Sequence, residues 1–171
     1  MSRWSHLQGW TGLAVLALVA AGCAPVGAKP DLALQGDGAR WVAKMMRSLS
    51  IEEKVAQMVA CRYAGNFYPA DGDERAHLRD LIVRHKVGGM IIFGGDAYET
   101  AVLNNVLQKS AKVPLLIASD LERGAGNQVT GATLFPTIMG IGAADSEELA
   151  YEMGKRTALE GRALGIHMTY A

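Results

Sequence analysis

Two short apolar segments separated by a helical segment constrain the fold of this 171-residue chain more than any other feature. The segments are "VGGMIIFGG", residues 87–95, and "VPLLIASD", residues 113–120. Between them, apolar residues such as Leu103 and Leu107 recur at helical spacing. Two buried strands joined by one helix form a βαβ unit with parallel strands. The sequence therefore predicts an α/β fold, and strands this apolar are typical of a sheet buried on both faces.

Further strand and helix patterns flank this unit. A helix is predicted directly after Ser50, which forms a capping box with Glu53, and Asp145 is the expected N-cap of a later helix. The remaining predicted elements are strands at residues 58–65 and 165–171 and helices at about residues 75–85 and 146–164. Three or four strand–helix units make half of a barrel or most of an open sheet.

The first residues have the pattern of an export signal. Arg3 precedes "GLAVLALVAAGC", residues 12–23, an apolar run that is too short to span a bilayer and that closes on small residues. The end of this run, "VAAGC", resembles a bacterial lipobox, which predicts residues 1–22 as a signal peptide and Cys23 as the lipidated first residue of the mature protein. Ordinary cleavage after a small residue is the alternative. Both interpretations predict that the protein leaves the cytoplasm.

The segment after the cysteine predicts a tether and a destination. Residues 23–38 contain prolines and glycines and are interpreted as a lipid-anchored linker, so the folded part is expected over residues 39–171. Ala24 and Pro25 lack the aspartate that retains lipoproteins at the inner membrane, which favours the periplasmic face of the outer membrane or the cell surface. Once Cys23 is lipidated, Cys61 has no partner for an internal disulfide.

The charge balance argues against a nucleic-acid partner. The chain has 17 basic and 17 acidic side chains and a formal net charge of zero. Proteins that bind the phosphate backbone normally carry a basic patch or stripe. We therefore expect no nucleic acid among the partners.

Asp120 is the strongest candidate for a functional side chain, because it ends an apolar strand. Polar residues at the carboxyl ends of parallel strands line the ligand crevice of α/β folds. With Glu122 two residues later, the pair could bind a metal, transfer protons or hold hydroxyl groups. No histidine or second carboxylate pair lies nearby, so no metal is expected. The alternative is structural: Glu122 and Arg123 form a local ion pair, and Gly124 and Gly126 supply positive φ angles.

Other candidate residues have an equally plain structural interpretation. Asp96 follows the strand at residues 87–95, where it either faces the crevice or caps the next helix. His167 either faces a ligand or is a structural histidine. An aromatic and polar loop is predicted after the first strand, where it either stacks on a sugar or packs on its own fold. That loop comprises Tyr63, Asn66, Phe67 and Tyr68.

Three segments together resemble the N-terminal domain of glycoside hydrolase family 3. They are "PLLIASDLERGAG", "GATLFPTIMGIGAADSEELAYEMGK" and "EGRALGIHMTYA", residues 114–126, 131–155 and 160–171. The resemblance implies the first part of a TIM-type (β/α)8 barrel. It also implies that Asp120, Glu122 and Arg123 bind a β-linked sugar, and that no cofactor takes part. Leu121 and Arg123 depart from the pattern of the hexosaminidase branch.

The resemblance implies a retaining hydrolase of terminal β-linked sugars, either a β-N-acetylhexosaminidase or, next, a β-glucosidase. In that family the aspartate nucleophile and the proton donor lie after the point that matches Ala171, so no catalytic residue is expected within this chain. One alternative is a non-catalytic truncated lipoprotein that binds sugar weakly. Another is a flavodoxin-type open sheet, which the lack of a phosphate loop after the first strand disfavours.

Overall fold

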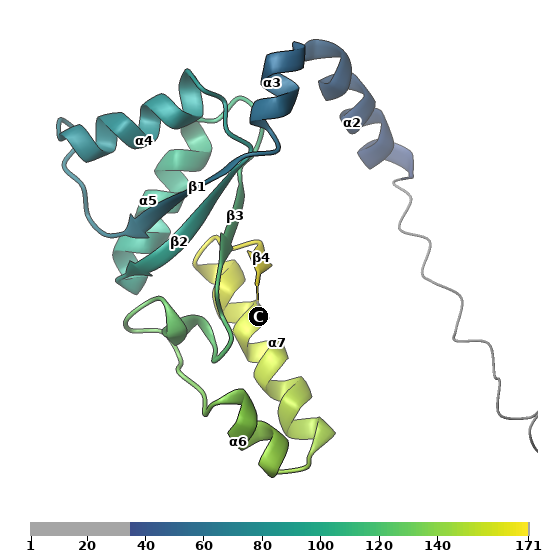
Figure 1. Ribbon diagram of the computed structural model, residues 1–171, viewed down its shortest axis with the longest axis vertical. Helices are drawn as coiled ribbons and strands as arrows, with labels where there is room; N and C mark the ends of the chain where they lie inside the picture. The colour runs from purple at the N-terminus through teal and green to yellow at the C-terminus, as the bar shows by residue number, and fades with distance from the viewer. Residues whose placement is uncertain (1–34, 171) are drawn as a thin grey trace, which may run out of the picture. The chain divides into compact units, whose positions relative to one another are not determined.

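Strands and helices alternate along residues 35–170, the part of the chain that the computed structural model describes (Figure 1). All adjacent strands are parallel, in the order β1-β2-β3-β4. The strands are β1 (Ala60–Gly65), β2 (Gly89–Gly95), β3 (Leu116–Ser119) and β4 (Met168–Thr169). The predicted α/β class and the parallel βαβ unit are therefore confirmed.

The helical segments are α2 (Gly36–Ser48), α3 (Ile51–Ala56), α4 (Asp73–Val83), α5 (Ala97–Ser110), η1 (Ala125–Asn127), α6 (Ile138–Ala143) and α7 (Glu147–Ala163). The predicted helices after Ser50, before β2, between β2 and β3 and before β4 are all present, and three further helical segments, α2, η1 and α6, were not predicted. Among the described residues, no helix is both long and apolar enough to cross a membrane.

The chain divides into two units, residues 1–42 and 43–171, and α2 runs across their boundary. Helix α2 begins at Gly36, so residues 36–38 of the predicted linker are helical. The predicted signal peptide and Cys23 lie outside the described residues.

The core lies on one side of the sheet, between the strands and the helices. Met90, Ile92 and Ile117 of the two central strands are fully buried. Leu78 of α4 and Leu107 of α5 are buried in the same cluster. Each such side chain contributes roughly 1.5–3 kcal/mol when it leaves water. We call this side of the sheet the helix face.

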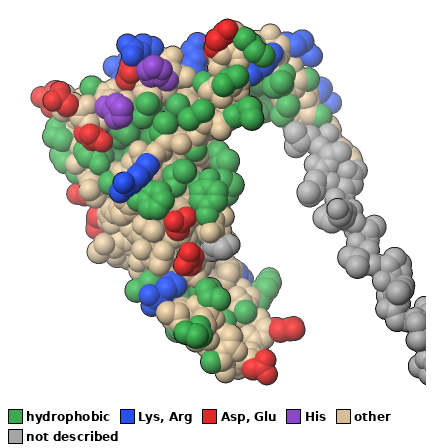
Figure 2. All heavy atoms as spheres, viewed as in Figure 1, with side chains coloured by type: hydrophobic (Ala, Val, Ile, Leu, Met, Phe, Trp, Pro, Cys, Tyr) green, Lys and Arg blue, Asp and Glu red, His purple; other side chains and the backbone are tan. Residues whose placement is uncertain are grey.

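The opposite side of the sheet is less covered by the described residues, 35–170, and we call it the open face. Because side chains alternate along a strand, Arg62, Phe93 and Leu116 lie opposite the buried residues of their strands. Leu116 is 47% exposed. Figure 2 shows hydrophobic side chains at the surface in the region of the strands, beside a basic side chain. The prediction of a strand buried on both faces is wrong for residues 87–95, since Ile91 and Phe93 on the open face are only half-buried. On the same face of β3, Leu116 is exposed whereas Ala118 is buried.

The predicted capping box is confirmed at the start of α3. The Ser50 hydroxyl accepts from the Glu53 N–H, and the Glu53 carboxylate accepts from the Ser50 N–H. The residues after α3 then approach β2 closely, because the Gly88 N–H donates to the Val59 carbonyl at 3.1 Å. A Cβ at Gly88 would lie 2.0 Å from the Gln57 carbonyl oxygen, so this contact requires glycine.

The predicted N-cap of the last long helix is one residue out. Ser146, not Asp145, caps α7, and its hydroxyl accepts from the Leu149 N–H at 3.3 Å. Asp145 takes a left-handed conformation with φ of 48°, which turns the chain into the helix. Both residue types are good caps, so the backbone turn decides between them.

Candidate functional site

Asp120 lies directly after β3, at the carboxyl end of the parallel sheet. The alternation along Leu116, Ala118 and Asp120 places its side chain on the open face. The carboxylate has no hydrogen bond or ion pair with any residue in the described range 35–170, and the residue is half-buried. Its oxygens therefore remain available to accept hydrogen bonds from a ligand.

The main chain at Asp120 is fixed from two directions. The Asn127 side-chain amide donates to the Asp120 carbonyl at 2.9 Å. The Leu121 N–H donates to Thr169 Oγ1 at 3.1 Å, which ties the end of β3 to β4. A carboxylate on a fixed main chain loses little conformational entropy when it binds a ligand.

The glycine-rich loop after Asp120 folds against residues 132–135. The Phe135 N–H donates to the Arg123 carbonyl at 2.8 Å. Gly124 has φ of 90°, as expected, and a Cβ there would lie 2.5 Å from the Thr133 carbonyl oxygen. Gly126 does not have the expected positive φ; its role is close approach, since a Cβ there would lie 2.7 Å from the Ala132 carbonyl oxygen.

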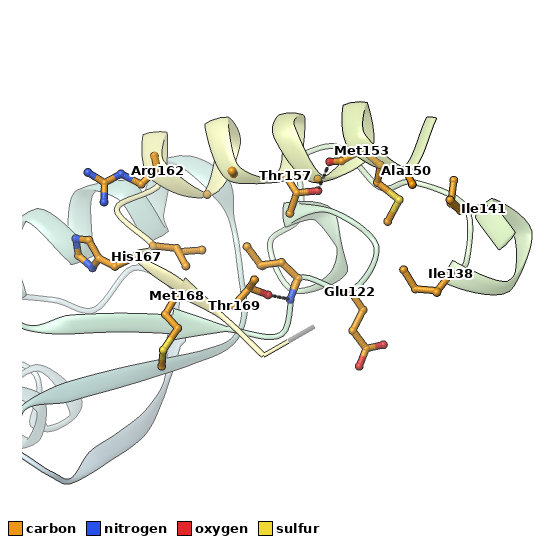
Figure 3. A pocket seen from close by; sticks show the side chains of 15 residues that line it. Glu122, Ile138, Ile141, Ala150, Met153, Thr157, Arg162, His167, Met168 and Thr169 are labelled. Atoms are coloured by element: carbon orange, nitrogen blue, oxygen red, sulfur yellow. Dashed lines mark hydrogen bonds between the residues drawn. The ribbon is translucent and has the colours of Figure 1, made fainter. Parts of the chain in front are cut away.

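Arg123 and Glu122 take different positions. The Arg123 Nε–H donates to the Phe135 carbonyl at 3.2 Å, so this side chain braces the loop. Glu122 lines a cavity and its carboxylate points away from α7 (Figure 3). In the described part of the chain neither residue is in an ion pair, so the alternative of a local Glu122–Arg123 pair is wrong. Substrate binding by Asp120, Glu122 and Arg123 stays a prediction.

The cavity beside Glu122 is an apolar space, separate from the Asp120 carboxylate. It has a volume of about 400 Å³ and lies between α6, α7 and the segment around β4 (Figure 3). Leu121, Ile138 and Met153 are among its lining side chains. The Thr157 hydroxyl at its wall donates to the Met153 carbonyl at 2.7 Å. The lining is mostly apolar, and its titratable side chains are Glu122, Arg162 and His167.

Asp96 has the capping role. Its carboxylate accepts from the Tyr98 N–H at 2.9 Å and from the Glu99 N–H at 3.3 Å, at the start of α5. The charge is also favourable near the positive end of the helix dipole. Asp96 therefore stabilises α5.

His167 has a structural role in the sheet. The Ile117 N–H donates to His167 Nδ1 at 3.1 Å, so that nitrogen is unprotonated. Burial lowers the pKa of His167, and the Arg162 guanidinium lowers it further. The side chain also lines the apolar cavity.

Tyr63 does not belong to the predicted aromatic loop. It lies within β1 and is buried, and its hydroxyl donates to the Asn104 side chain. Burial raises the pKa of the Tyr63 hydroxyl. Phe67 remains an exposed loop aromatic, and its N–H donates to the Glu99 carboxylate at 2.9 Å.

Two polar residues that hold the site together have no clear sequence signal. Glu160 of α7 accepts from the Thr133 N–H at 3.0 Å and from the Thr133 hydroxyl. Asn104 is buried and links β1 to the end of α7. A polar residue between Leu103 and Leu107 on the buried side of a helix was the one available hint for Asn104. Within residues 35–170, no group of three or more His, Cys, Asp or Glu is placed to hold a metal ion.

Comparison with known proteins connects this geometry to a family. Residues 50–171 match the profile of the glycosyl hydrolase family 3 N-terminal domain. The "Beta-N-acetylglucosaminidase/beta-glucosidase" of Cellulomonas fimi is 30% identical over 137 residues, which cover 80% of this chain and 23% of that protein.

Two solved structures share the fold of the chain. The structure of "Beta-glucoside phosphorylase BglX bound to 2FGlc" matches with a TM-score of 0.68 and 31% identity over 81% of this chain. The structure of "Beta-glucoside phosphorylase BglX" matches with a TM-score of 0.63 and 30% identity, also over 81% of this chain. The chain spans about a quarter of the length of these relatives, at 24% and 23%.

These likenesses explain the open face. In a (β/α)8 barrel, one face of every strand packs on helices and the other faces the barrel interior. Residues 35–170 form four of the parallel strands, so this fold is the first part of such a barrel, as predicted. Asp120 then lies at the end of the barrel where barrel enzymes hold their active sites. The chain belongs to glycosyl hydrolase family 3, and residues 50–171 form part of its N-terminal domain.

Proposed function

We propose that this chain is part of a β-glycosidase that holds the terminal sugar of its substrate through the Asp120 carboxylate. One observation carries the proposal: in a chain of this family, Asp120 is an unpartnered carboxylate at the carboxyl end of a parallel strand. Carboxylates accept strong, short hydrogen bonds from hydroxyl groups. A fixed carboxylate can therefore select a sugar by the positions of its hydroxyls.

The proposed reaction is hydrolysis with retention of the anomeric configuration. Retaining glycosidases use two carboxyl groups about 5–5.5 Å apart, one as nucleophile and one as acid and base. The proposal assigns both to a part of the protein outside residues 39–171, so the segment described here contributes binding. Hydrogen bonds from Asp120 to the sugar assist the reaction where they strengthen in the transition state.

Two sugars are candidates. A β-N-acetylhexosaminide is proposed first and a β-glucoside next, and the Cellulomonas fimi relative carries both activities in its name. Asp120 alone does not separate them, because both sugars offer hydroxyls along the same edge. The alternative function, a non-catalytic lipoprotein that binds sugar weakly, needs only Asp120 and its surroundings.

Phosphorolysis is a second candidate reaction. Both solved structures named above are described as β-glucoside phosphorylases, at 31% and 30% identity. In that reaction inorganic phosphate takes the place of water as the acceptor of the glycosyl group, and the product is a sugar phosphate. Both reactions act on a terminal sugar, so they share the role proposed for Asp120.

The test uses the natural protein, isolated from its own cells with an antibody raised to residues 39–171. Its mass is measured, and it is assayed on p-nitrophenyl β-glucoside and p-nitrophenyl β-N-acetylglucosaminide with and without inorganic phosphate. A product much heavier than 18.2 kDa that releases p-nitrophenol supports the enzyme. Sugar phosphate formed only with phosphate indicates phosphorolysis. A product near 18.2 kDa without turnover supports the lipoprotein alternative.

The role of Asp120 has its own test in the same protein. Asp120→Ala is expected to lower kcat/KM by about a hundredfold or more, because a charge-assisted contact in the transition state is lost. Asp96→Ala is the matched control, since that carboxylate caps a helix at the neighbouring strand end. An unchanged kcat/KM in a folded Asp120→Ala variant would refute the assignment.

We also propose that the protein is exported and anchored through a lipid on Cys23, on the periplasmic face of the outer membrane or on the cell surface. The support is the "VAAGC" sequence that ends the apolar run. Cells labelled with radioactive palmitate should give a labelled protein, and Cys23→Ser should abolish the label. A mature protein that lacks Cys23, or an unlabelled one that retains it, would contradict the anchor.

A further inference from the structure

The strand register, continued by one residue, places Phe93 of β2 level with Asp120 just after β3 and with Tyr170 just after β4. The paired residues just before this level are Ile92, Ser119 and Thr169. The Tyr170 N–H donates to the Ser119 carbonyl at 3.2 Å, so the pairing of β3 with the chain after β4 continues to this level. One further residue along each strand therefore brings Phe93 and Tyr170 to the two sides of Asp120.

All three side chains face the same way. Ile92 and Ser119 are fully buried on the helix face. The next residues lie on the open face, because successive side chains of a strand alternate. Neighbouring strands are about 4.8 Å apart. Asp120 is thus a carboxylate with an aromatic side chain on the adjacent strand at each side.

The two aromatic side chains are available to a ligand to different degrees. Tyr170 is 50% exposed, whereas Phe93 is half-buried under the Arg62 guanidinium, which lies 5.3 Å from the centre of its ring. This cation–π contact comes from β1 and holds the ring of Phe93 from the side away from Asp120. Ala118, two residues before Asp120 on the same face of β3, is buried and has only a methyl group as its side chain.

We propose that Phe93 and Tyr170 are the aromatic walls of the sugar site, with Asp120 between them. A pyranose ring has hydroxyls around its edge and C–H groups on its two faces. The carboxylate accepts hydrogen bonds from the edge, and the aromatic rings bury the C–H surface. Sugars with equatorial hydroxyls, as in the β-gluco series, expose the flattest C–H faces and are the preferred class. This inference rests on the proposed role of Asp120.

The experiment measures sugar binding by the full chain. Amide chemical shifts of ¹⁵N-labelled protein are followed while methyl β-D-glucoside or methyl β-N-acetylglucosaminide is added. Phe93→Leu and Tyr170→Leu should each raise the Kd for the sugar about three- to tenfold, which corresponds to the usual free energy of one aromatic contact. Tyr170→Phe keeps the ring and should bind as the wild type does. Tyr151→Leu removes an exposed aromatic of α7, 69% exposed, and is the control.

The outcomes separate this inference from the proposed function. If Asp120→Asn weakens binding but neither leucine variant does, the aromatic walls are refuted and the role of Asp120 stands. If the wild-type chain shows no saturable binding, both are refuted for this chain. Phe93→Tyr keeps an aromatic ring in the half-buried position. If Phe93→Tyr binds sugar as the wild type does while Phe93→Leu binds more weakly, the loss comes from the missing ring and not from disturbed packing. Circular dichroism of each variant checks the fold.

Discussion

A buried asparagine holds together the part of the fold that carries the candidate site. Asn104 of α5 is 2% exposed, and its carbonyl oxygen accepts from the Tyr63 hydroxyl of β1. Its amide donates to the Leu164 carbonyl, at the C-cap of α7, at 2.7 Å. Gly165 follows with φ of 80°, and a Cβ there would lie 3.3 Å from the Asn104 Cβ. This side chain therefore fixes both β1 and the turn that leads into β4.

Asn104→Ala should lower the free energy of unfolding by about 3 kcal/mol or more. The change leaves the Tyr63 hydroxyl and the Leu164 carbonyl buried without partners, at about 1–3 kcal/mol each. It also leaves a small cavity, which adds to the loss. Tyr63→Phe removes only one of the two hydrogen bonds and should cost about 1–2 kcal/mol.

Urea unfolding of each variant, followed by circular dichroism at 25 °C, gives these values. Asn105→Ala is the matched control, because Asn105 is the next residue of α5 and is exposed. We expect the control to stay within about 0.5 kcal/mol of the wild type. The double variant Asn104→Ala/Tyr63→Phe should cost less than the sum of the single variants by about 1 kcal/mol, since the two side chains share a hydrogen bond.

The refuting result is specific. If Asn104→Ala is no less stable than Asn105→Ala, the buried hydrogen bonds of Asn104 make no net contribution to the free energy of unfolding. The Asn104 side chain would then only fill space. If the two single variants are additive in the double variant, the Tyr63 and Asn104 side chains are not energetically coupled, and the loss in Asn104→Ala comes from the Leu164 carbonyl and the cavity.

Two further predictions concern the loop and the sheet. Gly124→Ala should destabilise the fold by about 1–2 kcal/mol or more, because Gly124 has a left-handed φ and a Cβ there would lie 2.5 Å from the Thr133 carbonyl oxygen. The control, Gly142→Ala in α6, should be neutral or stabilising. Equal effects of the two substitutions on the free energy of unfolding, measured with urea, would refute this prediction. Burial lowers the pKa of His167, so the folded state favours the neutral ring. The contribution of His167 to the free energy of unfolding should be complete above about pH 6.5 and should be lost as the pH falls below that value. His167→Asn should therefore show a smaller loss of stability at low pH. The same pH profile in the variant and the wild type would refute this role.

The strands and their direction were predictable because they are short apolar runs separated by helices. What the pattern could not give was which face of each strand is covered. Ile91 and Phe93 are as hydrophobic as Met90 and Ile92, yet they lie on the open face and are only half-buried. A strand of a barrel has an apolar side toward the interior, so hydrophobicity alone does not distinguish a face that packs on helices from one that faces the barrel interior.

Tyr63 was misplaced for a related reason. The strand predicted over residues 58–65 includes it, but its closeness to the polar stretch after Gly65 suggests that its ring belongs with the loop aromatics. The backbone continues as a strand to Gly65, and Tyr63 turns toward the helix face to meet Asn104. The partner that makes a buried tyrosine acceptable is forty-one residues away, so no local pattern can indicate it.

The candidate site follows the same division between local and long-range information. Asp120 could be found because an acid at the end of an apolar strand is a local signal. Phe93 and Tyr170 carry no such signal, because each stands in an apolar segment and reaches Asp120 only through the register of a neighbouring strand. That register depends on pairing between strands that are separated along the sequence by one or more helices. Side-chain alternation, however, turns a known register into a testable set of neighbours, and a shift of one residue in β4 would move Tyr170 to the helix face and remove one wall of the site.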